Sequence, residues 1–135
     1  MKTISTKTAK ITHLESNIVE LKLLNTNHAF NLEEAKKQKE VVQNLTKTEK
    51  YFILVDTRNA SVQPTKEAQK YLISLKTRHA EAIVVNGLAY KLLAKFYFSR
   101  IHAHPTKVFT NYDKAYQWIK NQKIEIDKKE EQTQA

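Results

Sequence analysis

The fold is decided by residues 80–119, which read AEAIVVNGLAYKLLAKFYFSRIHAHPTKVFTNYDKAYQWI. Two short apolar runs, at 81–85 and 106–109, alternate with two longer segments, at 88–101 and 110–119, whose apolar residues recur at helical spacing. Strands that alternate with helices are typical of an α/β layer structure with largely parallel strand pairing. This stretch therefore predicts the order strand, helix, strand, helix.

The preceding residues extend the same pattern. Residues 8–14 and 18–24 are predicted to form a β-hairpin, and a helix is predicted over 31–45. The run at 51–55 is apolar throughout, as expected of a central strand that is covered on both faces, and a helix is predicted after Pro64. The sequence predicts an α/β fold with a mixed five-stranded sheet, antiparallel at the edge hairpin and parallel elsewhere, with about four helices.

A single domain is expected over residues 1–122. After it the chain becomes charged and polar, and residues 123–135 are predicted to form a frayed or disordered tail. No apolar run approaches the roughly 20 residues that a membrane-spanning helix needs. The first ten residues, MKTISTKTAK, lack the apolar region of a signal peptide. We therefore expect a cytoplasmic protein with no membrane span.

The composition argues against several classes of chemistry. The chain has no cysteine, which excludes disulfides, a thiolate nucleophile and cysteine-ligated metals. With one glycine, neither a GxGxxG nor a GxxxxGK[ST] phosphate loop can be written, and the G-x-S-x-G hydrolase motif is absent. His102 and His104 are the closest histidine pair, but no third ligand accompanies them. We expect no enzyme activity, no cofactor and no metal.

The net charge of +9 raises the question of nucleic-acid binding. Only three basic residues are arginines, the side chain that forms bidentate contacts to phosphate and guanine, and the lysines are scattered along the chain. A dedicated binding face would concentrate them on one element. Nucleic acid is therefore not the expected partner, and weak non-specific polyanion binding is kept as an alternative.

The candidate recognition site directly follows the apolar run at 51–55. Open α/β sheets bind their ligands at the carboxyl ends of their strands. The site would use Asp56, Thr57, Arg58, Asn59 and Ser61. The alternative interpretation is a turn held by its aspartate, with a surface arginine.

The segment 88–101 is too broadly apolar to be covered by one sheet face. Three interpretations remain open: packing in a groove against the last helix and Trp118, a homodimer face, or one wall of an apolar ligand cavity. The residues proposed for the dimer or ligand surface are Leu93, Phe96, Tyr97 and Phe98.

Three segments carry a resemblance to a known fold: YFILVDTRNASVQPTKEAQKYL, HAEAIVVNGLAYKLLAKFYFSRIHAHP and TKVFTNYDKAYQWI. Together they resemble the SpoIIAA-like fold of STAS domains, the anti-sigma factor antagonists, and of small bacterial STAS/SEC14-type proteins. The resemblance covers about residues 8–122. It implies a non-enzymatic regulatory or protein-interaction domain with an unidentified protein partner. The alternative is a module that binds an apolar or lipid-like small molecule.

The resemblance also bears on phosphorylation. The antagonists read close to M-D-S-S-G after the central strand, and a partner kinase phosphorylates the second serine. Here Asp56 matches the aspartate, Thr57 the first serine and Arg58 the phosphoacceptor. Since an arginine cannot accept phosphate in this way, Thr57 and Ser61 are the remaining candidate acceptors.

Overall fold

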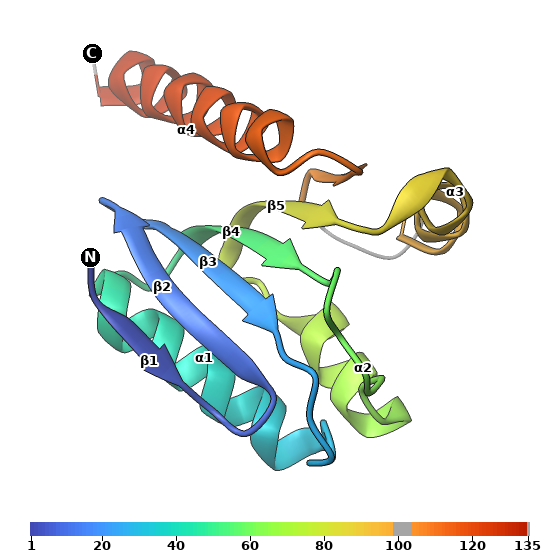
Figure 1. Ribbon diagram of the computed structural model, residues 1–135. Helices are drawn as coiled ribbons and strands as arrows, with labels where there is room; N and C mark the ends of the chain where they lie inside the picture. Colours follow the sequence, from blue (N-terminus) through green and yellow to red (C-terminus); the bar gives the residue numbers. More distant parts are fainter. Residues whose placement is uncertain (99–103, 135) are drawn as a thin grey trace.

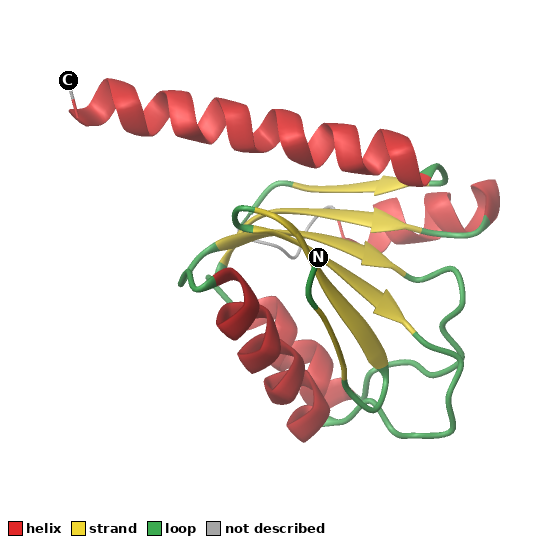
Figure 2. Cartoon of the chain, turned by 60° about the vertical axis from the view of Figure 1, so that its left-hand side comes forward, coloured by secondary structure: helices red, strands yellow, loops and turns green. Residues whose placement is uncertain are grey.

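The computed structural model describes residues 1–98 and 104–134, and the side chains of these residues except 93–98, 133 and 134. One mixed sheet carries helices on both of its faces (Figures 1 and 2). The elements are β1 (Thr3–Ser5), β2 (Ala9–Glu15), β3 (Ile18–Leu23), α1 (Leu32–Thr46), β4 (Tyr51–Asp56), α2 (Lys66–Ser74), β5 (Arg78–Val84), α3 (Gly87–Phe98), β6 (Thr106–Phe109) and α4 (Tyr112–Gln134).

The strand order confirms the predicted fold class with one strand added. The six strands lie in sequence order from β1 to β6, antiparallel from β1 to β3 and parallel from β3 to β6. The additional strand, β1, pairs with β2 at the edge. It was not predicted because Ile4 is its only apolar residue, so no period-2 pattern is visible.

A buried hydrogen-bond network fixes this edge to α1. The side chain of Asn31 caps α1 by accepting from the backbone N–H of Glu34 at 3.0 Å, as the sequence predicts. The Glu34 carboxylate in turn accepts from the Thr8 backbone N–H at 2.7 Å and hydroxyl at 2.6 Å, and from the Thr6 hydroxyl at 2.8 Å. The turn between β1 and β2 is thereby held against a helix far along the chain.

The two faces of the sheet have separate cores. On one face, α1 packs on alternate residues of β3 and β4, among them Val19, Leu21 and Ile53, and α2 lies beside α1 (Figure 2). On the other face, α4 packs on Phe52, Leu54 and the small residues of β5. Phe52, Ile53 and Leu54 are at most 1% exposed, which confirms β4 as a central strand.

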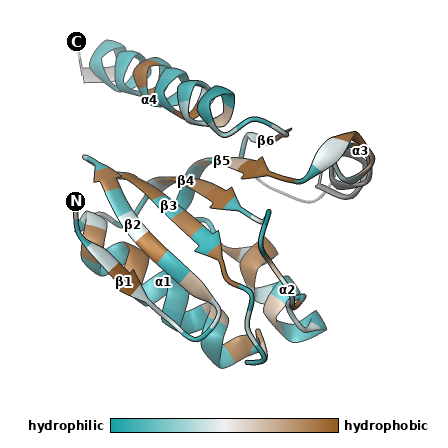
Figure 3. Cartoon of the chain, viewed as in Figure 1, coloured by the Kyte–Doolittle hydropathy of each residue, from teal (hydrophilic) through white to brown (hydrophobic). Residues whose placement is uncertain are grey.

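Residues 123–134, which were predicted to belong to a frayed or disordered tail, are helical in this structure, because α4 runs to Gln134. Ile126 packs against the core of that face, and Lys123 forms an ion pair of 3.1 Å with Asp127, one helical turn further on. One apolar contact and one i,i+4 pair extend the helix through a sequence that otherwise has little to bury. Figure 3 shows this part of α4 as largely hydrophilic.

Helix α3 differs from the other helices in its position. It contacts β6 and lies beside the carboxyl end of β5, away from α1 (Figure 1). Trp118 packs on Phe109 of β6, with 5.9 Å between the ring centroids. Among the described residues, no helix is long and apolar enough to cross a bilayer.

Candidate functional site

The predicted loop after β4 begins with an internal ion pair. Asp56 is 3% exposed and accepts two hydrogen bonds from the Arg58 guanidinium, at 3.0 and 2.9 Å, and one from the Arg58 backbone N–H at 3.1 Å. Burial by itself would raise the pKa of Asp56, but these bonds, the Arg58 charge and nearby Lys22 hold it below its ordinary value. The positive charge expected to recognise a partner is thus paired within the loop.

Arg58 also connects the loop to α4. Its guanidinium carbon lies 5.7 Å from the centre of the Tyr112 ring, and the Tyr112 hydroxyl donates to the Glu20 carboxylate. Burial and this hydrogen bond raise the pKa of the Tyr112 phenol. Asp56 and Arg58 therefore belong to the α4 face of the sheet, where they fix the start of α4.

The two candidate phosphoacceptors have structural partners. The Thr57 hydroxyl donates to the Val84 carbonyl at 2.8 Å. The Ser61 hydroxyl donates to the Thr26 carbonyl at 2.9 Å and accepts from the Thr26 N–H at 2.8 Å. Phosphorylation at either residue would remove a hydroxyl proton that the fold uses, and modification here stays a prediction. Asn59, between them, is exposed.

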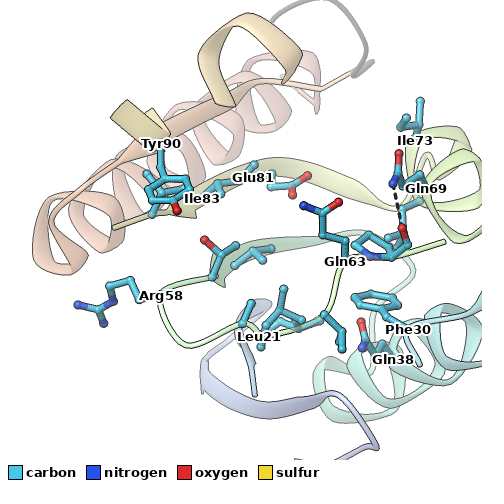
Figure 4. A pocket seen from close by; sticks show the side chains of 18 of the residues that line it. Leu21, Phe30, Gln38, Arg58, Gln63, Gln69, Ile73, Glu81, Ile83 and Tyr90 are labelled. Carbon is cyan, nitrogen blue, oxygen red and sulfur yellow. Dashed lines mark hydrogen bonds between the residues drawn. The ribbon is translucent and has the colours of Figure 1, made fainter. Parts of the chain in front are cut away.

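A cavity of about 760 Å³ lies on the opposite face, between the sheet, α2 and the start of α3 (Figure 4). Most of its wall is aliphatic or aromatic. The apolar lining includes Leu21, Val55, Val62, Leu72, Ile83 and Tyr90. Thr57, Arg58 and Ala60 also line it, so the predicted loop borders this cavity. Figure 4 shows the Arg58 side chain pointing away from the other labelled residues.

The cavity wall also carries buried charges that sequence reasoning missed. Arg78 Nη1 lies 2.8 Å from Glu81 Oε1, and His104 Nε2 lies 3.0 Å from the same oxygen. The three side chains are 9%, 6% and 6% exposed, and Arg78 and Glu81 line the cavity. Arg78 Nε has no hydrogen-bond partner among the described residues. The sequence contained one signal of this charged group, namely Glu81 within a buried strand, because a buried carboxylate requires a partner.

A β-bulge brings Arg78 and Glu81 to the same face. Residues three apart in a regular strand point to opposite faces. Here Tyr51 pairs with Arg78 but Phe52 pairs with Ala80, so His79 is an extra residue in β5. His79 stacks on Phe52 on the α4 face, while Arg78 and Glu81 both face the cavity.

The residues proposed for the dimer or ligand surface cannot be placed here. The side chains of Leu93, Phe96, Tyr97 and Phe98 lie outside the described residues. Tyr90, one of the residues of α3 that the structure does describe, borders the cavity. Within residues 1–98 and 104–134, no group of three or more metal-ligating side chains lies close together.

These features define a class: a small α/β domain with a SpoIIAA-like fold and an apolar cavity on one face of its sheet. A family model described as "Domain of unknown function (DUF7793)" matches residues 12–123, and the chain belongs to this family. The chain is also similar to the crystal structure of an uncharacterized protein of the DUF3478 family with a SpoIIAA-like fold, from Shewanella loihica PV-4. The identity is 14% and the TM-score 0.58, over 86% of this chain and 98% of that chain. This likeness shows the fold alone. No curated protein matches the chain.

Proposed function

We propose that the protein binds an amphipathic small molecule in the cavity between the sheet, α2 and α3. The observation that carries this proposal is the combination of a cavity of about 760 Å³, a mostly apolar wall and a buried charged pair in that wall. Ligand sites of small molecules range from about 300 to 1,000 Å³ and have mostly apolar walls with few polar groups. The main part of the ligand is therefore apolar.

The charged pair specifies the polar end of the ligand. A buried ion pair contributes little net stability, because the cost of removing both charges from water offsets their attraction. Arg78 lines the cavity, and its buried Nε–H has no hydrogen-bond partner among the described residues. An oxygen acceptor on the ligand, such as a carboxylate, would accept from this guanidinium while Glu81 continues to neutralise part of its charge.

Fluorescence titration with a dansyl-labelled medium-chain fatty acid tests the proposal, followed by displacement with unlabelled fatty acid. Ala60 is exposed and lines the cavity, so Ala60→Trp should fill part of it and weaken probe binding about tenfold or more, or 1.4 kcal/mol. Asn59→Trp is the matched control, because it adds the same side chain to the same loop without lining the cavity. Equal effects of the two variants, or no probe binding by the wild type, would contradict the proposal.

A protein-interaction role is the second candidate. The observation in its favour is the exposed stretch from Arg58 to Ser61 at the cavity border, where the Arg58 side chain is 39% exposed. In this case Asn59→Trp would weaken partner capture and leave probe binding unchanged. The absence of enzyme activity and the cytoplasmic location stay predictions.

A further inference from the structure

The first half of α3 exposes apolar side chains to an unusual degree. Leu88, Tyr90 and Leu92 are 68%, 65% and 61% exposed. Among the described residues, only Met1 and Ile124 are other large apolar side chains that are comparably exposed. Figure 3 shows brown, hydrophobic segments at the start of α3, whereas most of α4 is teal. A globular protein rarely leaves such a group of residues uncovered.

Leu88 and Leu92, four residues apart, lie on one side of the helix, about 40° apart around its axis. At about 100° per residue, Leu88 and Tyr90 project about 160° apart around the helix axis. Both are exposed, and so is Ala89 between them. This half of α3 therefore stands clear of the sheet on several sides, rather than resting one face on it.

The sequence around α3 has a uniform charge sign. Between Glu81 and Asp113 there is neither an aspartate nor a glutamate. The same stretch contains the basic residues Lys91, Lys95, Arg100 and Lys107. The exposed apolar helix thus lies within a purely basic segment, although the chain as a whole contains 14 acidic residues.

We propose that the side of α3 that carries Leu88 and Leu92 is a docking surface for an anionic phospholipid membrane. Helices with Leu and aromatic residues beside Lys or Arg lie in the interfacial plane of a bilayer, where buried apolar area and attraction to anionic headgroups act together. With 12 residues, α3 is too short to span the bilayer and would lie along its surface.

The charge pattern favours a membrane over a second copy of the chain. A two-fold dimer through α3 places the same patch against itself. It would bring α3 of one copy, which contains lysines and no acidic residue, against α3 of the other. An anionic bilayer provides the complementary charge. Because Tyr90 of the same helix lines the cavity, a docked α3 would also place the cavity near a source of amphipathic molecules.

Co-sedimentation with vesicles tests the docking surface. The full chain is mixed with vesicles of phosphatidylcholine alone, or of phosphatidylcholine with phosphatidylglycerol. Leu88→Glu places a charge on the exposed start of α3 and does not touch the cavity lining. Ile124→Glu is the matched control, because it makes the same change at a residue of α4 that is 51% exposed. Both variants alter the net charge equally, so their difference reports the local apolar contact.

The wild type should sediment with the phosphatidylglycerol vesicles and much less with phosphatidylcholine alone, and the binding should weaken with added salt. Leu88→Glu should weaken binding about tenfold or more, and Ile124→Glu less than about twofold. Equal behaviour of the two variants, or no vesicle binding by the wild type, would overturn the proposal. So would light scattering that shows a dimer which Leu88→Glu dissociates. The assay does not depend on a ligand in the cavity, so it can fail or succeed independently of the probe titration.

Discussion

The buried pair of Arg78 and Glu81 in the cavity wall gives the sharpest stability prediction. Arg78→Met removes the cation and leaves Glu81, which is 6% exposed, with His104 as its remaining partner in this group. Glu81→Leu leaves the guanidinium of Arg78 buried without its carboxylate. Breaking a buried pair from one side costs about 3–5 kcal/mol, because an uncompensated charge stays in the interior. We expect Arg78→Met near the lower end of this range, since His104 still contacts Glu81.

These free energies correspond to large changes in melting temperature. At about 2.1 cal/mol/K of unfolding entropy per residue, 1 kcal/mol lowers the Tm of a chain of 135 residues by about 3.5 °C. Each single variant should therefore melt about 10–18 °C below the wild type. Urea unfolding at neutral pH measures the same loss as a lower midpoint with an unchanged m-value.

The double variant tests the physical reason. Arg78→Met with Glu81→Leu removes both charges and keeps apolar side chains of similar length, so its loss should be smaller than that of either single variant. The resulting coupling energy should exceed about 2 kcal/mol. Additive losses would refute the coupling. The double variant also separates stability from function: it should fold, yet bind the fatty-acid probe weakly, because the guanidinium proposed to hold the polar end is gone.

Three further predictions concern the core, acid stability and the C-terminal helix. Leu54→Ala should destabilise the protein by about 2–5 kcal/mol in urea unfolding, because Leu54 is fully buried, and a loss below about 1 kcal/mol would contradict a core role. Burial alone would raise the pKa of Glu34, but hydrogen bonds from Thr8 and its neighbours hold this pKa below 4.5. The ionised Glu34 therefore stabilises the fold above about pH 4.5, and this stabilisation is lost as the pH falls through the lowered pKa. Glu34→Gln should therefore lower the Tm most at neutral pH and flatten its fall in acid, which melts from pH 7 to 3 would measure. Ile126→Ser should lower the Tm by several degrees while Ile124→Ser changes it little, since only Ile126 packs on the core, and equal melting temperatures would refute this account of α4.

Much of the fold could be predicted because most of its strands are recognisable from the pattern of their own residues. The run at 51–55 is apolar on both faces, and Val19, Leu21 and Leu23 alternate with polar residues, so both patterns are visible without knowledge of the neighbours. β1 has no such pattern. It joins the sheet at an edge, next to a turn that hydrogen bonds to Glu34 hold in place from 26 or 28 residues away.

The loop after β4 was predicted as the recognition site, and its role in recognition stays a prediction. The rule that parallel sheets bind at their carboxyl ends led to the loop after β4, which does border the cavity. The Ser61 hydroxyl is bonded to Thr26, 35 residues away in the sequence, and the Thr57 hydroxyl to the Val84 carbonyl, 27 residues away. No local sequence pattern predicts hydrogen bonds between residues so far apart. The cavity itself was one of three interpretations of the apolar segment 88–101.

The sequence by itself determined the order of strands and helices, the apolar centre of the sheet and the basic, acid-free character of the segment around α3, because each depends on residue types within a short window. Only the tertiary structure decided which polar groups meet. A single extra residue in β5, His79, turns Arg78 and Glu81 to the same face. His104, which precedes β6 in the chain, contacts the same Glu81 carboxylate. A period-2 pattern cannot reveal this meeting, because a bulge forms through pairing with the neighbouring strand and shifts every following side chain to the opposite face.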